Sequence, residues 1–178
     1  PPSMPPSSPV YVFDFATSTS PGWSTGGGWS GTPSGPSWAG ATSPYPFFWR
    51  SSGGTPSGGT GPSGGPGGGG YYFAETSYPR QANDLYTLSY DGSACATGEV
   101  ISSVSFQYHR WGGPTGMLSV VDANGASKWS LIGEQGHDWY FASVAFFSPS
   151  LRFEYTRGSS YSGDTAVGMV EVVCGFAQ

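Results

Sequence analysis

Apolar and polar side chains alternate along several stretches of the chain with the two-residue period of a half-buried β-strand. Within residues 104–109, Val104, Phe106 and Tyr108 alternate with polar neighbours, and residues 151–156 repeat the pattern. Residues two positions apart on a strand lie on the same face, so each stretch predicts a strand with one buried face. No stretch shows apolar residues at helical spacing between capping residues, and we therefore expect an all-β fold.

Shorter apolar runs separated by turn residues predict further strands. These runs cover residues 10–15, 47–49, 71–73, 117–121, 128–132, 139–147 and 165–174. Asn124 and Gly125 lie between two of the runs and predict a β-hairpin. Many short strands of this kind indicate a sandwich or a barrel. We expect the first and last strands to lie side by side and close the sandwich.

Glycine, serine and proline dominate the remaining segments. Residues 1–9 predict an extended polyproline II arm, because proline fixes φ and has no amide hydrogen to donate. Residues 17–46 are interpreted as a long loop with aromatic anchors. Residues 51–70 have the composition of a flexible linker, which we expect to lie against the domain's own surface. The sequence thus predicts an arm over residues 1–9 and one domain over residues 10–178.

Size and charge narrow the class of protein. The chain has 178 residues, enough for one domain and an appendage, and it begins with Pro, which indicates a fragment or a processed chain. The net charge is −5 and the six basic residues are scattered, so nucleic acid is not an expected partner. No apolar run approaches the ~18 residues that a membrane span needs.

The chain contains two cysteines, Cys95 and Cys174. Two cysteines far apart in a chain with few lysines and many aromatic residues favour one disulfide in an oxidising compartment. We therefore expect a secreted, extracellular or cell-surface protein. The alternative is a pair of buried free thiols.

Six segments, in order along the chain, resemble the MAM domain, an extracellular module of meprins, neuropilins and receptor tyrosine phosphatases. They are FDFATSTSPGW (13–23), WRSSGGTPSGGTGPSGG (49–65), GYYFAETS (70–77), SFQYHRWGGPTGMLSV (105–120), GEQGHDW (133–139) and GDTAV (163–167). The resemblance implies a jelly-roll-like β-sandwich of two antiparallel sheets with an adhesive or assembly role, often between identical copies. It implies no catalytic residues. It also implies a bond between Cys95 and Cys174, whereas the family's first cysteine pair is absent.

Acidic residues that bind a cation in some members of that family are mostly replaced here. The resemblance implies Glu at the position of Ala16 and an Asp pair at the positions of Gly168 and Met169. Asp14 and Asp164 remain as candidate metal ligands. Two carboxylates make a poor cage for Ca²⁺, which takes about six to eight oxygen ligands. We therefore expect no metal and no cofactor.

Two motifs contain residue types that are common in catalytic sites. Glu134, His137 and Asp138 form either a metal or acid/base cluster or a polar turn before Trp139, and we favour the turn. His109 is either a general base or a structural, hydrogen-bonded histidine, and we favour the structural role. The sequence therefore predicts no catalytic residue.

Aromatic residues in or beside loops are candidate contacts for a protein partner or a glycan, since Trp and Tyr are enriched at interfaces. They are Trp23, Trp29, Trp38, Tyr45 and Trp111. The alternative is that they cover the core. The arm carries candidate sites of proline hydroxylation and O-glycosylation, or else it is an interdomain linker. Its candidate residues are Pro1, Pro2, Ser3, Pro5, Pro6, Ser7, Ser8 and Pro9.

The function expected from these features is that of a non-catalytic extracellular adhesion or structural module. It would be a self-associating subunit of a filament, matrix or cell-surface assembly, contacted through its proline-rich arm, with copies of itself or another extracellular protein as partner. The alternative is a carbohydrate-binding module that uses the loop aromatics. A polysaccharide hydrolase has no positive support in the residues.

Overall fold

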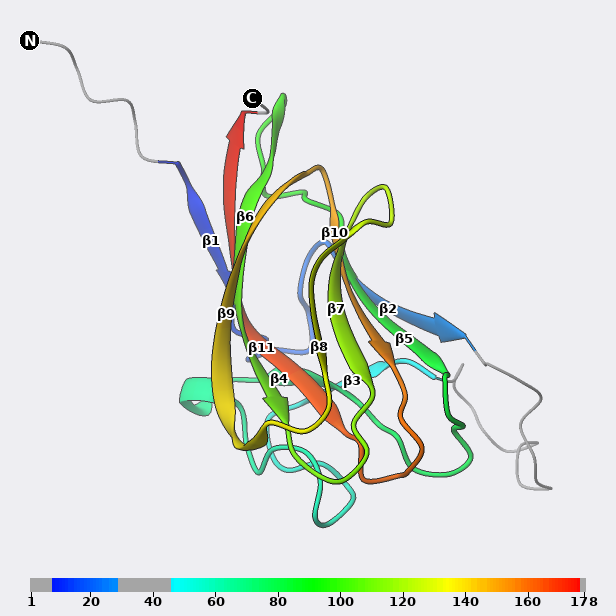
Figure 1. Cartoon of the computed structure of the whole chain (residues 1–178). Helices are drawn as coiled ribbons and strands as arrows, with labels where there is room; N and C mark the ends of the chain where they lie inside the picture. The colour runs from blue at the N-terminus through cyan, green and yellow to red at the C-terminus, as the bar shows by residue number, and fades with distance from the viewer. Residues whose placement is uncertain (1–7, 29–45, 177–178) are drawn as a thin grey trace, which may run out of the picture.

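The computed structural model describes residues 8–28 and 46–176, which form a sandwich of two antiparallel sheets (Figure 1). The first sheet has the order β3 (Phe48–Ser51), β4 (Tyr71–Ala74), β11 (Thr165–Phe176), β6 (Glu99–Arg110) and β9 (Gly136–Ser148), and β1 (Val10–Phe13) also pairs with β11. The second sheet has the order β2 (Trp23–Gly28), β5 (Leu85–Tyr90), β10 (Leu151–Thr156), β7 (Met117–Asp122) and β8 (Ser127–Ile132). The predicted all-β sandwich is confirmed.

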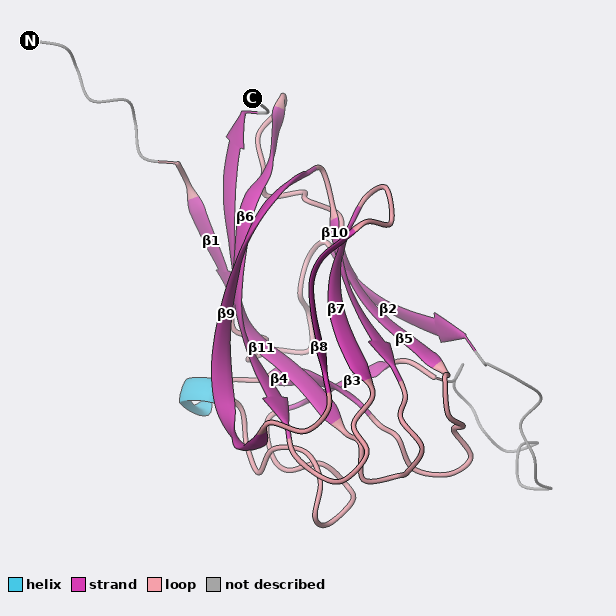
Figure 2. Cartoon of the chain, in the orientation of Figure 1, coloured by secondary structure: helices cyan, strands magenta, loops and turns pink. Residues whose placement is uncertain are grey.

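Helical structure is confined, in the described part of the chain, to one short 3-10 turn, η2 (Pro66–Gly68), which lies outside the two sheets (Figure 2). Among these residues no helix has both the length and the apolar character that crossing a bilayer requires. The functional surfaces must therefore be built from strand faces, strand edges and loops.

Rings from both sheets fill the space between them. Phe106 of β6 contacts Phe153 of β10 edge-to-face at 5.0 Å between ring centroids, and it contacts Trp129 of β8 at 5.2 Å. Phe106 and Phe153 are fully buried, as their positions in the alternating pattern predict. Edge-to-face packing at these distances is favourable beyond the apolar area that it buries.

The first and last strands lie side by side, as predicted. β1 pairs antiparallel with β11 from Val10 opposite Val173 to Phe13 opposite Val170. The disulfide that the MAM resemblance implies is present, joining Cys95 to Cys174 over 79 positions of sequence. It attaches the segment before β6 to the end of β11.

Residues 17–46 are not a loop throughout, because Trp23–Gly28 forms strand β2. β2 pairs with β5 from Trp23 opposite Tyr90 to Gly28 opposite Leu85. No strand was predicted over β5 either. The β2 sequence WSTGGG lacks apolar alternation, and its backbone hydrogen bonds are independent of side chains. A Cβ on Gly27 would lie 1.7 Å from the carbonyl oxygen of Pro46, so this close approach requires glycine.

The glycine-rich segment over residues 51–70 lies against the domain, as expected. The backbone N–H of Gly61 donates to the carbonyl of Trp111 at 3.0 Å. The indole N–H of Trp139 donates to the carbonyl of Gly64, also at 3.0 Å. These contacts fold the segment over the outer side of the first sheet.

Arg110, the last residue of β6, connects the two sheets through a buried guanidinium. Its side chain is fully buried. Nε donates to the carbonyl of Gly133 and Nη1 to that of Leu131, each at 3.1 Å, and Nη2 donates to that of Gly116. Burial lowers the pKa of Arg110, yet an arginine stays protonated in proteins. One side chain of the first sheet thus holds the chain on both sides of the β7–β8 hairpin.

We expect the substitution Arg110→Met to lower the free energy of unfolding by about 3 kcal/mol or more, because the carbonyls of Gly133, Leu131 and Gly116 each lose a charged hydrogen-bond donor. Urea unfolding followed by tryptophan fluorescence measures the change. The control is Arg152→Met, which removes an arginine side chain that is 41% exposed and paired with Glu154. An exposed ion pair contributes about 1 kcal/mol or less. Equal losses in the two variants would contradict the role given to Arg110.

We expect the double substitution Cys95→Ala, Cys174→Ala to lower the free energy of unfolding by about 4 kcal/mol, because the bond closes a long loop in the unfolded chain. Urea unfolding with and without a reducing agent tests this. Reduced wild-type protein should unfold at the midpoint of the double variant. An unchanged midpoint in both would show that the bond does not stabilise the fold.

Candidate functional site

The two candidate metal ligands have different partners. Asp14 accepts the backbone N–H of Ala16 at 3.0 Å through Oδ1. Asp164 is fully buried, and its Oδ1 accepts both the backbone N–H and the hydroxyl of Thr76 at 2.9 Å. Within residues 8–28 and 46–176, no three His, Cys, Asp or Glu side chains are grouped so that they could hold a metal ion.

A cationic side chain of the protein itself lies beside the position where the MAM resemblance implies Glu. Arg50 of β3 donates from Nε to the carbonyl of Phe15 at 2.8 Å and from Nη2 to that of Ala16 at 2.5 Å. The guanidinium therefore satisfies two backbone oxygens there. At this position Ala16 offers no carboxylate, and the charged side chain present is that of Arg50.

Asp164 has a strongly altered pKa. Burial and, next, the charge of Glu75 raise the pKa to about 7, against the opposing effect of the hydrogen bonds from Thr76. Its Oδ2 has no hydrogen-bond partner among the described residues. This carboxyl group is therefore close to half-protonated at neutral pH.

Trp23 covers one end of the core. Its indole stacks on Tyr90 with 5.0 Å between ring centroids and meets Phe13 and Phe15 edge-on at 5.3 and 5.1 Å. Trp23 is half-buried, and it both packs against the core and lines a hollow of about 530 Å³. The other candidate aromatics before β3 lie outside the described residues, namely Trp29, Trp38 and Tyr45. Of the arm, only Ser8 and Pro9 are described, and both are exposed.

Trp111 belongs to a cluster of rings that joins two sequence motifs. Its indole stacks on the imidazole of His137 with 3.9 Å between centroids and 13° between planes. The His137 ring in turn lies 5.2 Å from that of His109. The cluster forms because β6 and β9 are paired, with His109 opposite Trp139. Within this motif, residues 133–135 lie in the turn before β9, whereas His137 lies in β9 and joins the ring cluster.

His109 is buried, with 1% of its surface exposed, but it is not fully hydrogen-bonded. Its Nδ1 has no partner among the described residues. Burial and, next, the neighbouring His137 lower the pKa of His109 to about 4, against the opposing charge of Asp138, so the imidazole is neutral at pH 7. The expected hydrogen-bonded structural histidine is thus buried, but one ring nitrogen lacks a protein partner.

Two adjoining hollows open beside these rings. One, of about 310 Å³, is lined by Pro62, Ser63, Gly64, Gly65, His109, His137, Asp138 and Trp139. The other, of about 230 Å³, includes Trp111 in its wall. Pro62, Ser63 and His137 line both, so the two hollows are neighbours.

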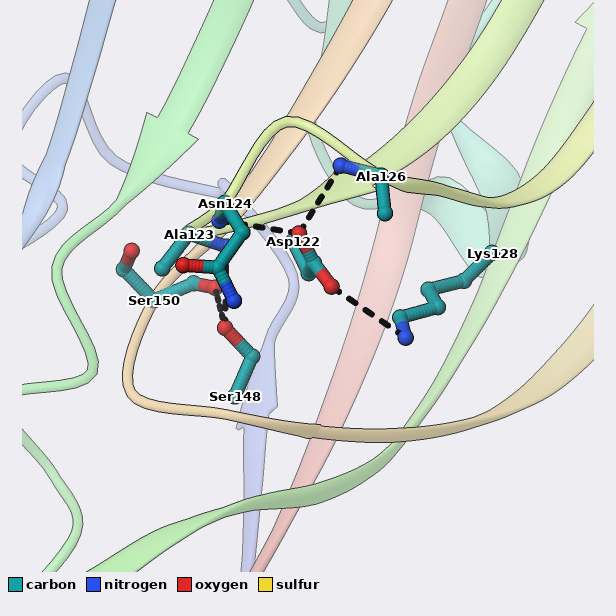
Figure 3. A network of polar contacts seen from close by, with 7 residues as sticks. All are labelled: Asp122, Ala123, Asn124, Ala126, Lys128, Ser148 and Ser150. Carbon is teal, nitrogen blue, oxygen red and sulfur yellow. Dashed lines mark hydrogen bonds and ion pairs between the residues drawn. The ribbon is translucent and has the colours of Figure 1, made fainter.

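A third hollow, of about 530 Å³, lies at the end of the second sheet near the β7–β8 turn, and Asp122 lines it. Both carboxylate oxygens of Asp122 are engaged (Figure 3). Oδ1 accepts the N–H groups of Asn124 and Ala126 at 2.9 Å, and Oδ2 pairs with Lys128 at 3.1 Å. Asp122 therefore stabilises the predicted Asn-Gly hairpin.

Strand β9 forms one edge of the first sheet, since its ladder runs along β6 alone in the described structure. Residues 139–148 contain no charged residue and no proline. Phe141 is 67% exposed and Phe147 is 55% exposed. By contrast, the edge strand β3 has four residues and contains Arg50, and β8 has six and contains Lys128. β9 is thirteen residues long.

Comparisons with known proteins identify relatives of this chain. No family model matches the chain. The chain is 38% identical over 112 residues to MAM domain-containing glycosylphosphatidylinositol anchor protein 1 of Homo sapiens, a match that covers 55% of this chain and 11% of that protein. It is 32% identical over 141 residues to MAM domain-containing protein 2 of Mus musculus, covering 71% of this chain and 19% of that protein. The resemblance to MAM domains is confirmed.

The MAM-like chain spans only 11% to 19% of the length of these two relatives. Among solved structures, the K2 cleaved adhesin domain of Lys-gingipain aligns with a TM-score of 0.60 at 13% identity, covering 92% of this chain and 99% of that one. A family 29 carbohydrate-binding module aligns with a TM-score of 0.51 at 10% identity, covering 93% and 92%. At these identities the likeness shows the fold alone.

Sequence reasoning did not join His109 to His137 or identify β9 as an edge. The MAM-like motifs offered a signal for the pair of histidines, because each histidine lies two positions before a tryptophan, in or next to a predicted strand. The edge position of β9 has no signal in the residues. Alternation shows which side chains of a strand share a face, but it does not show which strands pair with it.

We expect Asp164 to contribute stability that falls as pH rises from about 4 to about 7, because its folded pKa, about 7, exceeds its ordinary value of 3.8. The folded state binds this proton more tightly, so the contribution is fully present below the unfolded pKa and is lost through the folded one. The slope of this contribution should approach 1.4 kcal/mol per pH unit. His109, whose folded pKa of about 4 lies below its ordinary 6.5, contributes the opposite slope between those values, so the Asp164 contribution is the difference between wild type and Asp164→Asn. Urea unfolding at pH 5, 6, 7 and 8 measures it.

Asp164→Asn should remove most of this dependence, since an amide oxygen still accepts both bonds from Thr76. The matched control is Asp91→Asn, at an exposed aspartate, and it should leave the slope unchanged. A wild-type slope that persists in Asp164→Asn would assign the pH dependence to another group.

Proposed function

We propose that this chain is a non-catalytic extracellular adhesion or structural module that self-associates through the edge of β9. The observation that carries the proposal is the long, uncharged, exposed edge of that strand. The names of its relatives, which include a glycosylphosphatidylinositol anchor protein, support a location outside the cell. The Cys95–Cys174 bond supports the same location, because disulfides persist in oxidising compartments.

The physical basis is strand addition. An edge strand turns unpaired N–H and C=O groups outward, and proteins that remain monomeric protect such edges with Pro, Lys, short length or a bulge. β9 pairs regularly with β6 from Trp139 to Ala145, and a register shift follows before Ser148. The unprotected part is therefore about seven residues long, which is enough for a ladder.

The occupant that we propose is a second copy of the same strand. Two identical strands can pair antiparallel across a twofold axis, and most homo-oligomers are closed by such an axis. The absence of charge over residues 139–148 avoids repulsion between the copies. In a pairing centred on Ser143, Phe141 of each copy would face Ala145 of the other.

The proline-rich arm is proposed as a second contact, with a neighbouring copy or another extracellular protein. Its support is that Ser8 and Pro9 are exposed where the arm leads into β1. The carbonyl of Pro9 accepts the N–H of Cys174 at 3.2 Å. Two different contacts on one subunit would permit a repeating assembly.

We expect wild-type protein to sediment as a concentration-dependent dimer or larger species, and the double substitution Phe141→Lys, Ala145→Lys to give a monomer. Four ammonium groups would then lie on one face of the paired strands. The matched control is Ile132→Lys on the other sheet's edge strand β8, where Ile132 is 72% exposed. It should associate like wild type in analytical ultracentrifugation.

A variant that lacks residues 1–7 tests the contact through the arm separately from the contact through β9. If the deletion weakens higher assembly and leaves the dimer, both proposed contacts stand. A wild-type protein that remains monomeric at several hundred micromolar would overturn self-association.

A further inference from the structure

The hollow beside His109 is lined by a side chain with one polar atom that has no partner among the described residues. His109 is 1% exposed, its Nδ1 has no hydrogen bond to those residues, and its side chain lines the hollow of about 310 Å³. Buried polar groups almost always find a partner, so an unpaired one on a side chain that lines a hollow points to a ligand. A neutral imidazole offers one donor and one acceptor, which matches a hydroxyl group.

The rest of the wall has the same chemistry. The Asp138 carboxylate, the Ser63 hydroxyl and the backbone of Gly64 and Gly65 line the hollow with His109. Each presents hydrogen-bonding groups at short spacing. A ligand with many hydroxyl groups can satisfy several of them at once, and a simple apolar ligand would leave them unpaired.

The adjoining hollow supplies a flat aromatic surface. Trp111 and His137 stack with 13° between their planes, and both line the hollow of about 230 Å³. Rigid aromatic rings give apolar contact area at low cost in conformational entropy. The hydrogen-bonding wall and the ring pair thus lie next to each other, with His137 in both.

The charges of the residues that line the two hollows argue against an anionic ligand. Among the described residues, those that line the two hollows include no Lys or Arg, and Asp138 is acidic. An anionic ligand would therefore meet repulsion and no counter-charge. Two imidazoles and one carboxylate are present, yet the described residues form no group that could hold a metal ion.

We propose that the two hollows beside β6 and β9 form a binding site for a neutral oligosaccharide. One sugar unit would lie against Trp111 and His137, and its neighbour would hydrogen-bond to His109, Asp138 and Ser63. The site meets the exposed edge of β9 at Trp139, whereas the five residues assigned to the sugar lie outside residues 139–145, so its chemistry does not depend on self-association.

Isothermal titration calorimetry with four neutral tetrasaccharides tests the site, namely cellotetraose, mannotetraose, xylotetraose and maltotetraose. We expect at least one to bind, and tetragalacturonate, the anionic control, not to bind. Trp111→Ala and His137→Ala should each weaken binding about tenfold or more. Phe176→Ala removes an exposed ring outside both hollows and should bind like wild type.

The imidazole nitrogens of His109 provide a second measurement that needs no substitution of a buried residue. In ¹⁵N spectra, the Nδ1 resonance of His109 should shift on addition of the tetrasaccharide that binds. Failure of all four tetrasaccharides at millimolar concentration would overturn the proposal. So would binding that Trp111→Ala and His137→Ala leave unchanged, or that leaves the His109 nitrogens unshifted.

Discussion

The buried guanidinium of Arg110 organises one end of the sandwich. Two sheets that share only loops and a core can slide past one another, and three hydrogen bonds from β6 to the carbonyls on both sides of the β7–β8 hairpin prevent this. The opposite end of β6 lies beside β11, where Ile101 pairs with Cys174 of the disulfide. β6 therefore has a buried charge at one end, and at the other it lies beside the strand that carries the disulfide.

The same residue positions the ring cluster. Its side chain holds the carbonyl of Gly133, and its backbone carbonyl accepts the N–H of Gln135 at 2.8 Å. These two contacts direct the chain into β9, so that His137 reaches the residues on either side of Arg110, His109 and Trp111. The geometry of both hollows thus follows from a structural arginine that lines neither of them.

The fold was largely predictable from the residues, whereas the surfaces were not. Alternation around Phe106 and Phe153 marks strands because burial on one face imposes a period of two. β2 was missed because its glycines carry no such signal, although backbone pairing with β5 and the packing of Trp23 hold it. His109 and His137 became neighbours only through strand order, which depends on many weak contacts that no single segment encodes. The exposed edge of β9 follows from strand order in the same way.

The antiparallel pairing of β1 with β11 has a mechanical consequence. Ser8 and Phe176 lie at the same end of that ladder (Figure 1). Tension applied between them would open the pairs in succession from Val10 opposite Val173, as a zipper opens, with little resistance. The Cys95–Cys174 bond would keep residues 95–174 out of the path of the load, so the four-residue strand β1 would yield first. A domain that has lost β1 in this way would expose a new strand edge along the part of β11 that β1 covers.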